Sequence, residues 1–253
     1  MMGIRFLLMF ANVAVPACWV LTGFSLWAGS LMFGTHMLTL WAIFWPSCRW
    51  WGEVTCEFRT NEPEVWLTID DGPDGDNTRV VMDLLEERKA KATFFFVGAM
   101  CRKYPELPAE VKRRGHGVAN HTDNHRAYVF WCMGPRQIFR ELTACSASLE
   151  KLSGSKPTLF RAPAGFRNCF VHPVLARLGM KLVGWSARGF DGSRCDVDRI
   201  ISRIEKRIRP GAVIVLHEGR VSDDGIPLIC KTLPRVLDLI ELRGLKAVIP
   251  KIS

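Results

Sequence analysis

Charge is almost absent from the beginning of this chain. Residues 1–52 contain no aspartate, glutamate or lysine, and Arg5 and Arg49 are their only strongly basic residues. All 25 acidic residues of the 253-residue chain therefore lie beyond Gly52, where the net charge is about +7. This moderate basic excess is compatible with a surface near anionic lipid or with an acidic substrate. We therefore treat residues 1–52 and 53–253 as two units.

Three further patterns are missing. No Lys/Arg-rich run and no alternation of basic and aromatic residues is present, which argues against a nucleic-acid-binding protein. No Gly-x-Gly-x-x-Gly loop follows the first predicted strand, so nothing indicates a bound nucleotide. The nine cysteines form no Cys-x-x-Cys pair, which predicts reduced thiols in a reducing compartment rather than a disulfide framework. In the polar unit these thiols include Cys101, Cys132, Cys145, Cys169, Cys195 and Cys230.

Two apolar stretches occupy the N-terminal unit. The first, residues 6–28, is long enough to cross a bilayer as a helix, and the second, residues 31–46, is shorter. Three tryptophans cluster where the second stretch ends, a position that suits the membrane–water interface: Trp45, Trp50 and Trp51. We predict a membrane hairpin, or a pair that dips into the membrane and returns. A cleaved signal peptide is the alternative, because Arg5 precedes an apolar core.

The orientation of this hairpin follows from its two arginines. Arg5 and Arg49 flank the apolar stretches, and the link between the stretches carries no strong charge. Because basic residues prefer the cytoplasmic side of a membrane, both ends of the hairpin and the whole polar unit are predicted to lie in the cytoplasm.

From Val65 onward, apolar strand patterns alternate with helical patterns. Strands are predicted at 65–69, 93–97, 117–120, 158–160, 181–185, 212–216 and 247–249. Helices are predicted at 77–90, 105–114, 135–152, 172–178, 196–208 and 227–243, with Asn77 and Asp196 as N-caps. Gly115, Gly179 and Gly244 follow helices and predict left-handed stops. Seven strands alternating with helices predict a parallel sheet, either open or closed.

Reactive side chains follow several of these strands, always at the C-terminal end. They are Asp70 and Asp71 after the first strand, His121 and His125 after the third, Arg161 after the fourth, Asp191 past the fifth and His217 at the end of the sixth. In a closed barrel these ends converge on one mouth, whereas an open sheet scatters several of them along an edge. The sequence therefore favours a barrel of the TIM type.

The aspartate pair and the histidine pair suggest a metal site. Taken alone, Asp70-Asp71-Gly72 reads more simply as a solvated turn after a strand. His121 and His125, however, are spaced i, i+4 and would share one face of a helical turn, so that both imidazoles reach one metal ion. A carboxylate and two histidines with open coordination positions are typical of a catalytic metal site, and the second carboxylate is then free to act as a base.

These segments resemble the polysaccharide deacetylase family, which is carbohydrate esterase family four with the NodB-homology domain. The resemblance covers residues 64–249 and consists of five motifs in order: Thr68-Ile69-Asp70-Asp71-Gly72-Pro73, His121-Thr122-x-x-His125, Arg161-Ala162-Pro163-Ala164-Gly165, an altered fourth motif from Trp185 to Asp191, and Leu216-His217. It implies a distorted (β/α) barrel with fewer than eight strands, in agreement with the seven predicted here.

The resemblance also implies a role for each motif residue. Asp71, His121 and His125 would bind a divalent metal, most often zinc in this family. Asp70 would be the general base, oriented by Arg161, and His217 would be the acid that protonates the leaving amine. The backbone N–H of Ala164, beside Pro163, would hold the oxyanion.

The fourth motif departs from the family pattern. Arg188 stands at a position that is often acidic, and Gly192 replaces a tryptophan, while Asp191 remains and would pair with Arg161. These changes leave the metal chemistry intact but bring the usual acetylglucosamine polymer into question. Arg188 would suit a phosphate or carboxylate on the substrate, or it is a surface charge. Glu218, where many relatives have aspartate, is either a supporting residue behind the site or a surface acid.

Residues 128–131, Tyr-Val-Phe-Trp, follow the second histidine closely. Such a run either packs at the rim of the barrel or enters the membrane interface and guides a lipid-linked substrate. His116 and His172 match no motif and are predicted to be structural.

Together these patterns predict a metal-dependent amide hydrolase that removes an acetyl or formyl group from an amino sugar. The substrate would be a lipid-linked or membrane-proximal glycan, and the enzyme would work on the cytoplasmic side of a bacterial inner membrane. An outward-facing deacetylase of peptidoglycan or exopolysaccharide is the main alternative. An inactive carbohydrate-binding module on the same barrel, or a docking domain, is the other.

Overall fold

The computed structural model describes residues 2–22, 26–192 and 196–252. Its helices are α1 (Met2–Thr22), α2 (Leu26–Phe44), α3 (Asp76–Glu87), α4 (Gly98–Lys103), α5 (Leu107–Arg113), α6 (Ala127–Phe130), α7 (Pro135–Ser153), the 3-10 helix η1 (Pro163–Gly165), α8 (Val171–Leu178), α9 (Val197–Glu205) and α10 (Leu228–Leu242). Its strands are β1 (Glu64–Asp70), β2 (Ala92–Phe96), β3 (Gly117–Asn120), β4 (Leu159–Phe160), β5 (Lys181–Leu182), β6 (Ala187–Arg188), β7 (Val213–His217) and β8 (Lys246–Ala247).

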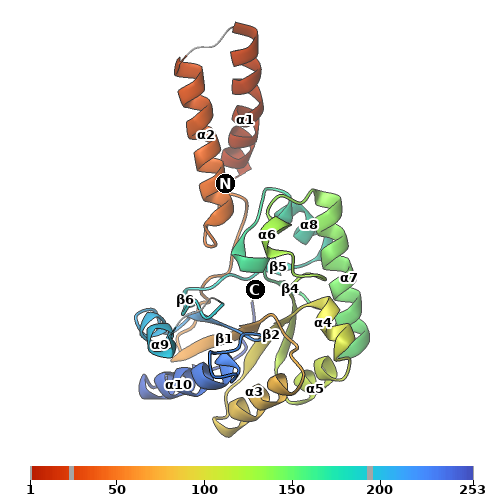
Figure 1. Ribbon diagram of the computed structural model, residues 1–253, viewed down its shortest axis with the longest axis vertical. Helices are drawn as coiled ribbons and strands as arrows, with labels where there is room; N and C mark the ends of the chain where they lie inside the picture. Colours follow the sequence, from red (N-terminus) through yellow and green to blue (C-terminus); the bar gives the residue numbers. More distant parts are fainter. Residues whose placement is uncertain (1, 23–25, 193–195, 253) are drawn as a thin grey trace.

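The strands form one parallel sheet in the order β5-β4-β3-β2-β1-β7-β6, and β8 pairs with the beginning of β1. The sheet curls into a half-barrel with helices on its outer side (Figure 1). The segment before β1 spans the opening, because Thr55 bridges to Val183 after β5 and Glu57 bridges to Ala212 before β7. The predicted parallel, barrel-like α/β fold is thus confirmed.

The individual strands differ from prediction at both ends of the sheet. β6, which pairs with β7, is absent from the predicted set. The predicted strand 181–185 is only two residues long, because the chain leaves the sheet after Leu182. Such short strands are held by pairing with distant neighbours, so the local apolar pattern carries little information about them.

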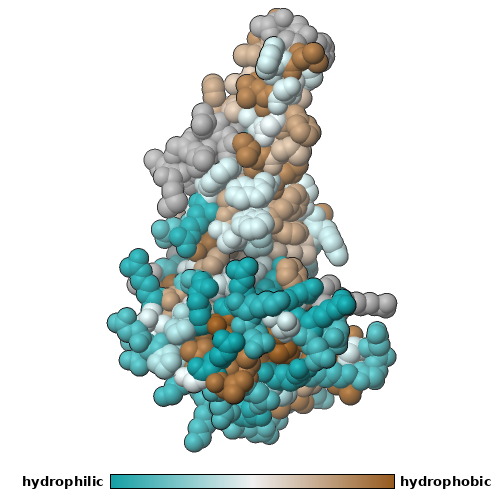
Figure 2. Space-filling model, turned by 90° about the vertical axis from the view of Figure 1, so that its left-hand side faces the viewer, coloured by the Kyte–Doolittle hydropathy of each residue, from teal (hydrophilic) through white to brown (hydrophobic). Residues whose placement is uncertain are grey.

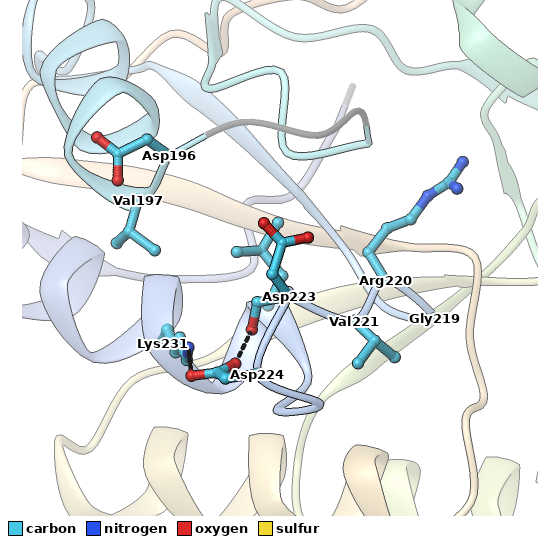
Figure 3. A pocket seen from close by; sticks show the side chains of 10 residues that line it. Asp196, Val197, Gly219, Arg220, Val221, Asp223, Asp224 and Lys231 are labelled. Atoms are coloured by element: carbon cyan, nitrogen blue, oxygen red, sulfur yellow. Dashed lines mark hydrogen bonds and ion pairs between the residues drawn. The ribbon is translucent and has the colours of Figure 1, made fainter.

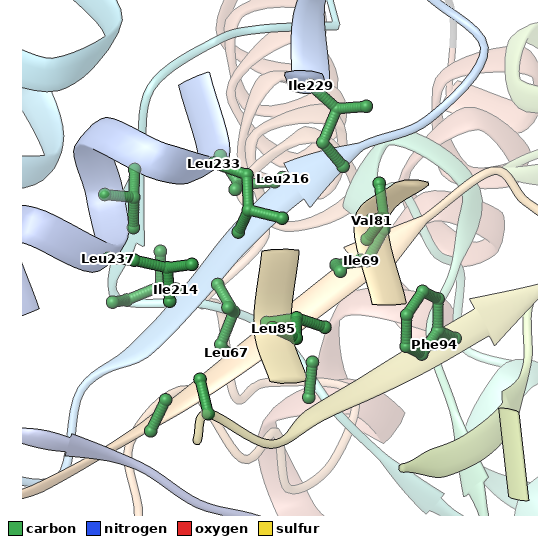
Figure 4. Close-up of a cluster of buried hydrophobic side chains, with 14 of the residues drawn as sticks. Leu67, Ile69, Val81, Leu85, Phe94, Ile214, Leu216, Ile229, Leu233 and Leu237 are labelled. Atoms are coloured by element: carbon green, nitrogen blue, oxygen red, sulfur yellow. The ribbon is translucent and has the colours of Figure 1, made fainter. Parts of the chain in front are cut away.

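The core lies on both faces of the central strands. Leu67 and Ile69 of β1 pack with Ile214 and Leu216 of β7 beneath helices α3 and α10 (Figure 4). The inner face is filled by another group of buried residues, namely Trp66, Phe95, Ala119, Val183 and Val213. A parallel sheet covered on both faces in this way holds the C-terminal ends of β1, β2, β3 and β7 in a rigid row.

Glycine and cap positions mostly follow the sequence. Gly115, Gly179 and Gly244 have φ of 77°, 66° and 65°, as the predicted left-handed stops require. Asp196 is the N-cap of α9, but the prediction for Asn77 is wrong. Helix α3 begins earlier, after Gly75, and the Asn77 amide donates a hydrogen bond to Asp74.

The eight cysteines among the described residues are all free thiols, in agreement with prediction. Cys195 lies outside the described residues. His116, predicted to be structural, is buried at the N-terminal ends of β2 and β3, and burial together with the charges of Lys91 and Arg114 lowers its pKa to about 4.

Helices α1 and α2 form a hairpin that extends away from the barrel (Figure 1). The Asn12 amide donates a hydrogen bond of 2.9 Å to Thr39 across the hairpin. Apolar side chains lie along the hairpin, above a mostly hydrophilic face of the barrel (Figure 2). Within the described residues, α2 is the one helix that is long and apolar enough to cross a membrane, and α1 contributes a shorter apolar segment, Phe10–Leu21.

The predicted break between the two apolar stretches lies in the wrong place. Gly29 and Ser30 are inside α2, which begins at Leu26. A small residue is suited to a close contact between helices, and a Cβ on Gly29 would lie 3.6 Å from the Trp19 ring. Residues 23–25, which belong to the first predicted stretch, are outside the described residues.

The hairpin is packed onto the barrel by the chain that leaves α2. Ala42, Ile43, Cys48 and Trp51 form a buried cluster together with Trp131 and Cys169 of the barrel. The fully buried Arg167 donates hydrogen bonds to the carbonyl oxygens of Pro46, Cys48 and Gly165. The hairpin exit and the loop after β4 are therefore one packed unit.

Replacing Arg167 with alanine is expected to leave these buried carbonyl oxygens without their donor. The free energy of unfolding should fall by about 2–4 kcal/mol, because each unsatisfied buried acceptor costs about 1–3 kcal/mol. Denaturant unfolding would measure the loss, and proteolysis should cut faster within residues 45–52. Arg207→Ala, which removes an exposed arginine, is the matched control. Equal stability of the two variants would show that the Arg167 hydrogen bonds do not hold the hairpin exit on the barrel.

Candidate active site

The aspartate pair lies where β1 ends. Asp70 is the last residue of this strand and is the register partner of His217 on β7 and of Phe95 on β2. Asp71 has a left-handed backbone with φ of 73°, which is uncommon outside glycine but tolerated by aspartate. Neighbouring strands therefore bring Asp70 and His217 together, while the turn after β1 gives Asp71 a separate position.

The two motif histidines lie in a loop after β3, not on a helical turn as predicted. Thr122 and His125 have positive φ values of 68° and 48°, which a right-handed α-helical turn does not contain. The loop is held by the Thr122 N–H, which donates to the Asn120 side chain, and by the His125 N–H, which donates to the Thr122 hydroxyl. The two imidazole rings still lie 4.8 Å apart between centroids.

Asp71, His121 and His125 form a compact group of metal-ligand atoms. Asp71 Oδ1 lies 3.4 Å from His121 Nε2 and 3.1 Å from His125 Nε2, and the three ligand atoms all lie within 4.8 Å of one another. Asp71 Oδ1 is buried and has no hydrogen-bond partner. A buried, unsatisfied carboxylate oxygen between two imidazole nitrogens is the environment that a divalent cation would complete.

The protonation of these groups also suits a cation. His121 Nδ1 lies 2.8 Å from the Arg161 carbonyl oxygen, to which it donates, so the lone pair of Nε2 faces Asp71. Burial and the neighbouring His121 lower the pKa of His125 to about 4, which leaves this imidazole neutral. Burial tends to raise the pKa of Asp71, but the surrounding histidines outweigh it and hold the pKa well below its ordinary value.

Arg161 is fully buried and binds Asp70. Its guanidinium donates a 2.6 Å hydrogen bond to Asp70 Oδ1, and it also donates to the Thr68 hydroxyl and to the Gly184 carbonyl oxygen. The Phe95 ring lies 4.2 Å below its carbon centre. The other oxygen, Asp70 Oδ2, lies 3.9 Å from His121 Nε2 and 4.0 Å from His217 Nε2. One carboxylate oxygen is thus held by Arg161, and the other faces the histidines.

Asp191 pairs with His217, not with Arg161 as predicted. Its carboxylate accepts hydrogen bonds from the His217 backbone N–H at 2.8 Å and from His217 Nδ1 at 2.9 Å. Burial lowers the pKa of His217, but the Asp191 carboxylate outweighs it and raises the pKa to about 9. His217 is therefore protonated at neutral pH.

The loop after β4 contains Pro163 and Ala164, which lie in the 3-10 helix η1. Pro163 is buried, whereas Ala164 is partly exposed and has an unusual left-handed backbone with φ of 53°. The loop runs on to Phe166, whose ring lies 5.0 Å from Phe44 at the end of α2. The predicted oxyanion residues are therefore adjacent to the hairpin exit.

The sequence left two alternatives open for Glu218 and two for the run 128–131. Glu218 is buried, so the surface alternative is wrong: it accepts a hydrogen bond from Thr78, and burial raises its pKa to about 8. The residues of the run 128–131 differ in their burial and contacts. Phe130 is buried in the core, Trp131 packs on Phe44, and Tyr128 is 93% exposed.

A cavity of about 830 Å³ lies beside the end of β7 (Figure 3). It is lined by the loop from Gly219 to Asp224 and by residues of α9 and α10, among them Lys231, which pairs with Asp224. None of the residues predicted for the site lines it. The loop begins two residues after His217. No local pattern in residues 219–224 marks the cavity.

Comparisons with known proteins identify relatives of this chain. A family model described as Polysaccharide deacetylase matches residues 58–183. The chain is 34% identical over 166 residues to a chitooligosaccharide deacetylase of Sinorhizobium fredii, covering 65% of this chain and 76% of that protein. It is 31% identical over 201 residues to a peptidoglycan-N-acetylglucosamine deacetylase of Bacillus cereus, covering 73% and 87%.

Solved structures show the same fold. A family 4 carbohydrate esterase from Streptomyces lividans, in complex with acetate, superposes with a TM-score of 0.66 at 27% identity, covering 76% of this chain and 94% of that chain. The curled parallel sheet, the five ordered motifs and these relatives lead to one conclusion. The chain belongs to the polysaccharide deacetylase family, whose members are hydrolases acting on amide carbon–nitrogen bonds.

Proposed function

We propose that this protein is a metal-dependent deacylase of an amino sugar that is attached to a lipid, acting at the surface of a bacterial inner membrane. The observation that carries the chemical part is the grouping of Asp70, the three ligand residues and a protonated His217 at one row of strand ends. The filled site also argues against the inactive binding module, because no position needed for hydrolysis has been replaced by an inert side chain.

The cation would be held by Asp71, His121 and His125, and we propose that it is zinc. Two imidazoles and a carboxylate with open positions are a familiar catalytic zinc set. When bound, such an ion lowers the pKa of a water molecule and polarises the carbonyl of the scissile amide.

Asp70 is proposed as the general base. Its Oδ1 is occupied by Arg161, which leaves Oδ2 to take the proton of the attacking water. His217 is proposed as the general acid, since its Nε2 faces the same oxygen and Asp191 keeps the imidazole protonated. The oxygen of the attacking water would bond to the amide carbon while Asp70 takes its proton. The carbon–nitrogen bond would then break, and the departing nitrogen would receive the His217 proton. The Ala164 N–H, beside Pro163, would hold the developing negative oxygen.

The membrane part of the proposal is supported by the hairpin. Residues 1–52 would anchor the chain, and residues 53–253 would form the catalytic barrel. The end of α2 packs against Phe166, two residues from Ala164, so the anchor lies beside the proposed active site. Aromatic side chains lie at this junction, where indoles suit the membrane–water interface: Trp41, Trp45 and Trp50. A substrate held in the same membrane would reach the site at a high effective concentration.

The acyl group is proposed to be acetyl, or formyl as the smaller alternative. Acetyl is supported by the relatives, which are named as deacetylases of chitooligosaccharide and of peptidoglycan N-acetylglucosamine. The second of these names also favours the alternative function, an outward-facing deacetylase of the cell wall. The two functions differ in the compartment in which the barrel would lie.

Replacing a ligand should have a different effect from replacing the base. His125→Ala is expected to abolish both metal retention and activity, while Asp70→Asn should keep the metal and lower turnover by about 10²–10⁴-fold. Metal content by elemental analysis and deacetylation rates would be measured on the same samples, with exposed Asp76→Ala as the control. Full activity after exhaustive chelation, or loss of metal in Asp70→Asn, would contradict the assignment.

The pH dependence should report the Asp191–His217 pair. A raised pKa keeps the acid protonated, so activity falls as the pH rises through the pKa of His217. Asp191→Asn removes the negative charge that stabilises the imidazolium, and the alkaline limb of kcat/KM should therefore move to lower pH. An unchanged alkaline limb in this variant would show that another group supplies the proton.

Location and substrate can be tested in the full-length protein. Cys132 is an exposed thiol on the barrel, and an impermeant thiol reagent should label it only after cells are permeabilised. In vesicles, the protein should deacetylate lipid-linked N-acetylglucosamine far faster than a soluble chitooligosaccharide of equal bulk concentration. Labelling of Cys132 in intact cells would instead favour the outward-facing deacetylase.

A further inference from the structure

Arg188 is a positive charge at the active site that the proposed reaction does not use. It lies on β6, which pairs with β7 next to the strand end that carries His217. It is half-buried, its Nε is buried without a hydrogen-bond partner, and it takes part in none of the ion pairs found among the described residues. Arg161, the other arginine at the site, already donates four hydrogen bonds to neighbouring groups of the protein.

Two aromatic rings hold the Arg188 guanidinium. Its carbon centre lies 5.0 Å from the Trp185 ring and 4.5 Å from the Phe190 ring. Phe190 adopts a left-handed backbone with φ of 65°, which is an uncommon conformation for a bulky residue. Stacking fixes the plane of a guanidinium but leaves the N–H groups at its edge available to a planar or tetrahedral anion.

Gly192, next to Asp191, has no side chain of its own. A Cβ added at Gly192 would lie 3.9 Å from the His217 ring, in ordinary van der Waals contact. Arg188 is the register partner of Val215, which lies two residues before His217 on β7. Burial lowers the pKa of Arg188, and the charges of Asp191 and Asp70 act in the opposite direction. A charged side chain kept partly buried without a counter-ion is suited to a ligand that brings one.

Arg188 also lies on the side of the site that the hairpin contacts. Trp185, which stacks on Arg188, packs against the loop after β4 and the hairpin exit: a Cβ on Gly165 would come within 2.5 Å of the Trp185 ring and 2.8 Å of Pro46. In Figure 1, β6 lies below the base of the hairpin. A lipid chain in the membrane and an anion at Arg188 would therefore be on the same side of the sugar.

We infer that Arg188 binds the phosphoryl group that joins the amino sugar to its lipid. The inference rests on the proposed lipid-linked substrate and adds its chemical class, a phosphate-linked glycolipid. Arg188 is then a specificity-determining residue, and the chemistry at the amide stays with the residues described above.

The test compares two substrates that differ only in the phosphate. Full-length protein in phosphatidylcholine vesicles is given N-acetylglucosamine joined to a prenyl chain through a phosphate, or joined to the same chain directly. Arg188→Ala should lower kcat/KM for the phosphate-linked substrate by about 10- to 100-fold, mostly through KM, since hydrogen bonds to a charged group are worth this much. The neutral substrate should change by less than about 2-fold. Arg188→Lys should restore part of the loss, and exposed Arg199→Ala should change neither substrate.

The outcomes separate the inference from the proposed function. An equal loss on both substrates, or no loss on either, would overturn the role of Arg188 while leaving the lipid-linked function intact. If the unmodified protein ignores both lipid-linked sugars and deacetylates soluble chitooligosaccharide, the proposed function itself fails, and the inference with it. Inorganic phosphate is the remaining probe: inhibition of the neutral substrate that disappears in Arg188→Ala would support a phosphate site at this residue.

Discussion

The buried ion pair between Arg161 and Asp70 is the interaction on which the rest of the site depends. Arg161 leaves β4 and reaches across the inside of the half-barrel to β1, while its own carbonyl oxygen accepts the Nδ1–H of His121. One residue thereby fixes which oxygen of Asp70 is free and which nitrogen of His121 faces the cation position. Removal of either partner alone would leave an uncompensated charge in the core, which is strongly destabilising.

Carboxylates of one chemical type acquire different functions here through their partners. Asp70 faces a guanidinium, Asp71 faces two imidazoles, and Asp191 faces the imidazole of His217. The guanidinium orients Asp70, and the imidazoles keep Asp71 ionised. Asp191 keeps His217 protonated. Glu218 is buried behind the turn after β1, where it accepts a hydrogen bond from Thr78 and burial raises its pKa. Environment, not residue type, assigns the tasks.

The hairpin and the barrel are connected by packing as well as by sequence. Buried hydrogen bonds from Arg167 and aromatic contacts of Phe44 join the end of α2 to the loop that carries Ala164. A flexible tether would leave the barrel free to rotate above a membrane, whereas this packed junction gives the strand ends a defined direction relative to the hairpin. The orientation of the site is thus a property of the fold.

Much of this protein follows from its sequence, because alternating strands and helices place reactive residues at strand ends wherever the sheet is parallel. That rule, with the five motifs, predicted the fold class and the grouping of Asp71, His121 and His125 beside Asp70. The tertiary structure decided what depends on backbone conformation and distant contacts. His125 lies in a loop that contains positive φ values. Asp191, after β6, pairs with His217 at the end of the neighbouring strand β7, and β6 itself forms by pairing with β7. Local sequence patterns do not predict such contacts, because the free energy of these contacts comes from residues far apart in the chain.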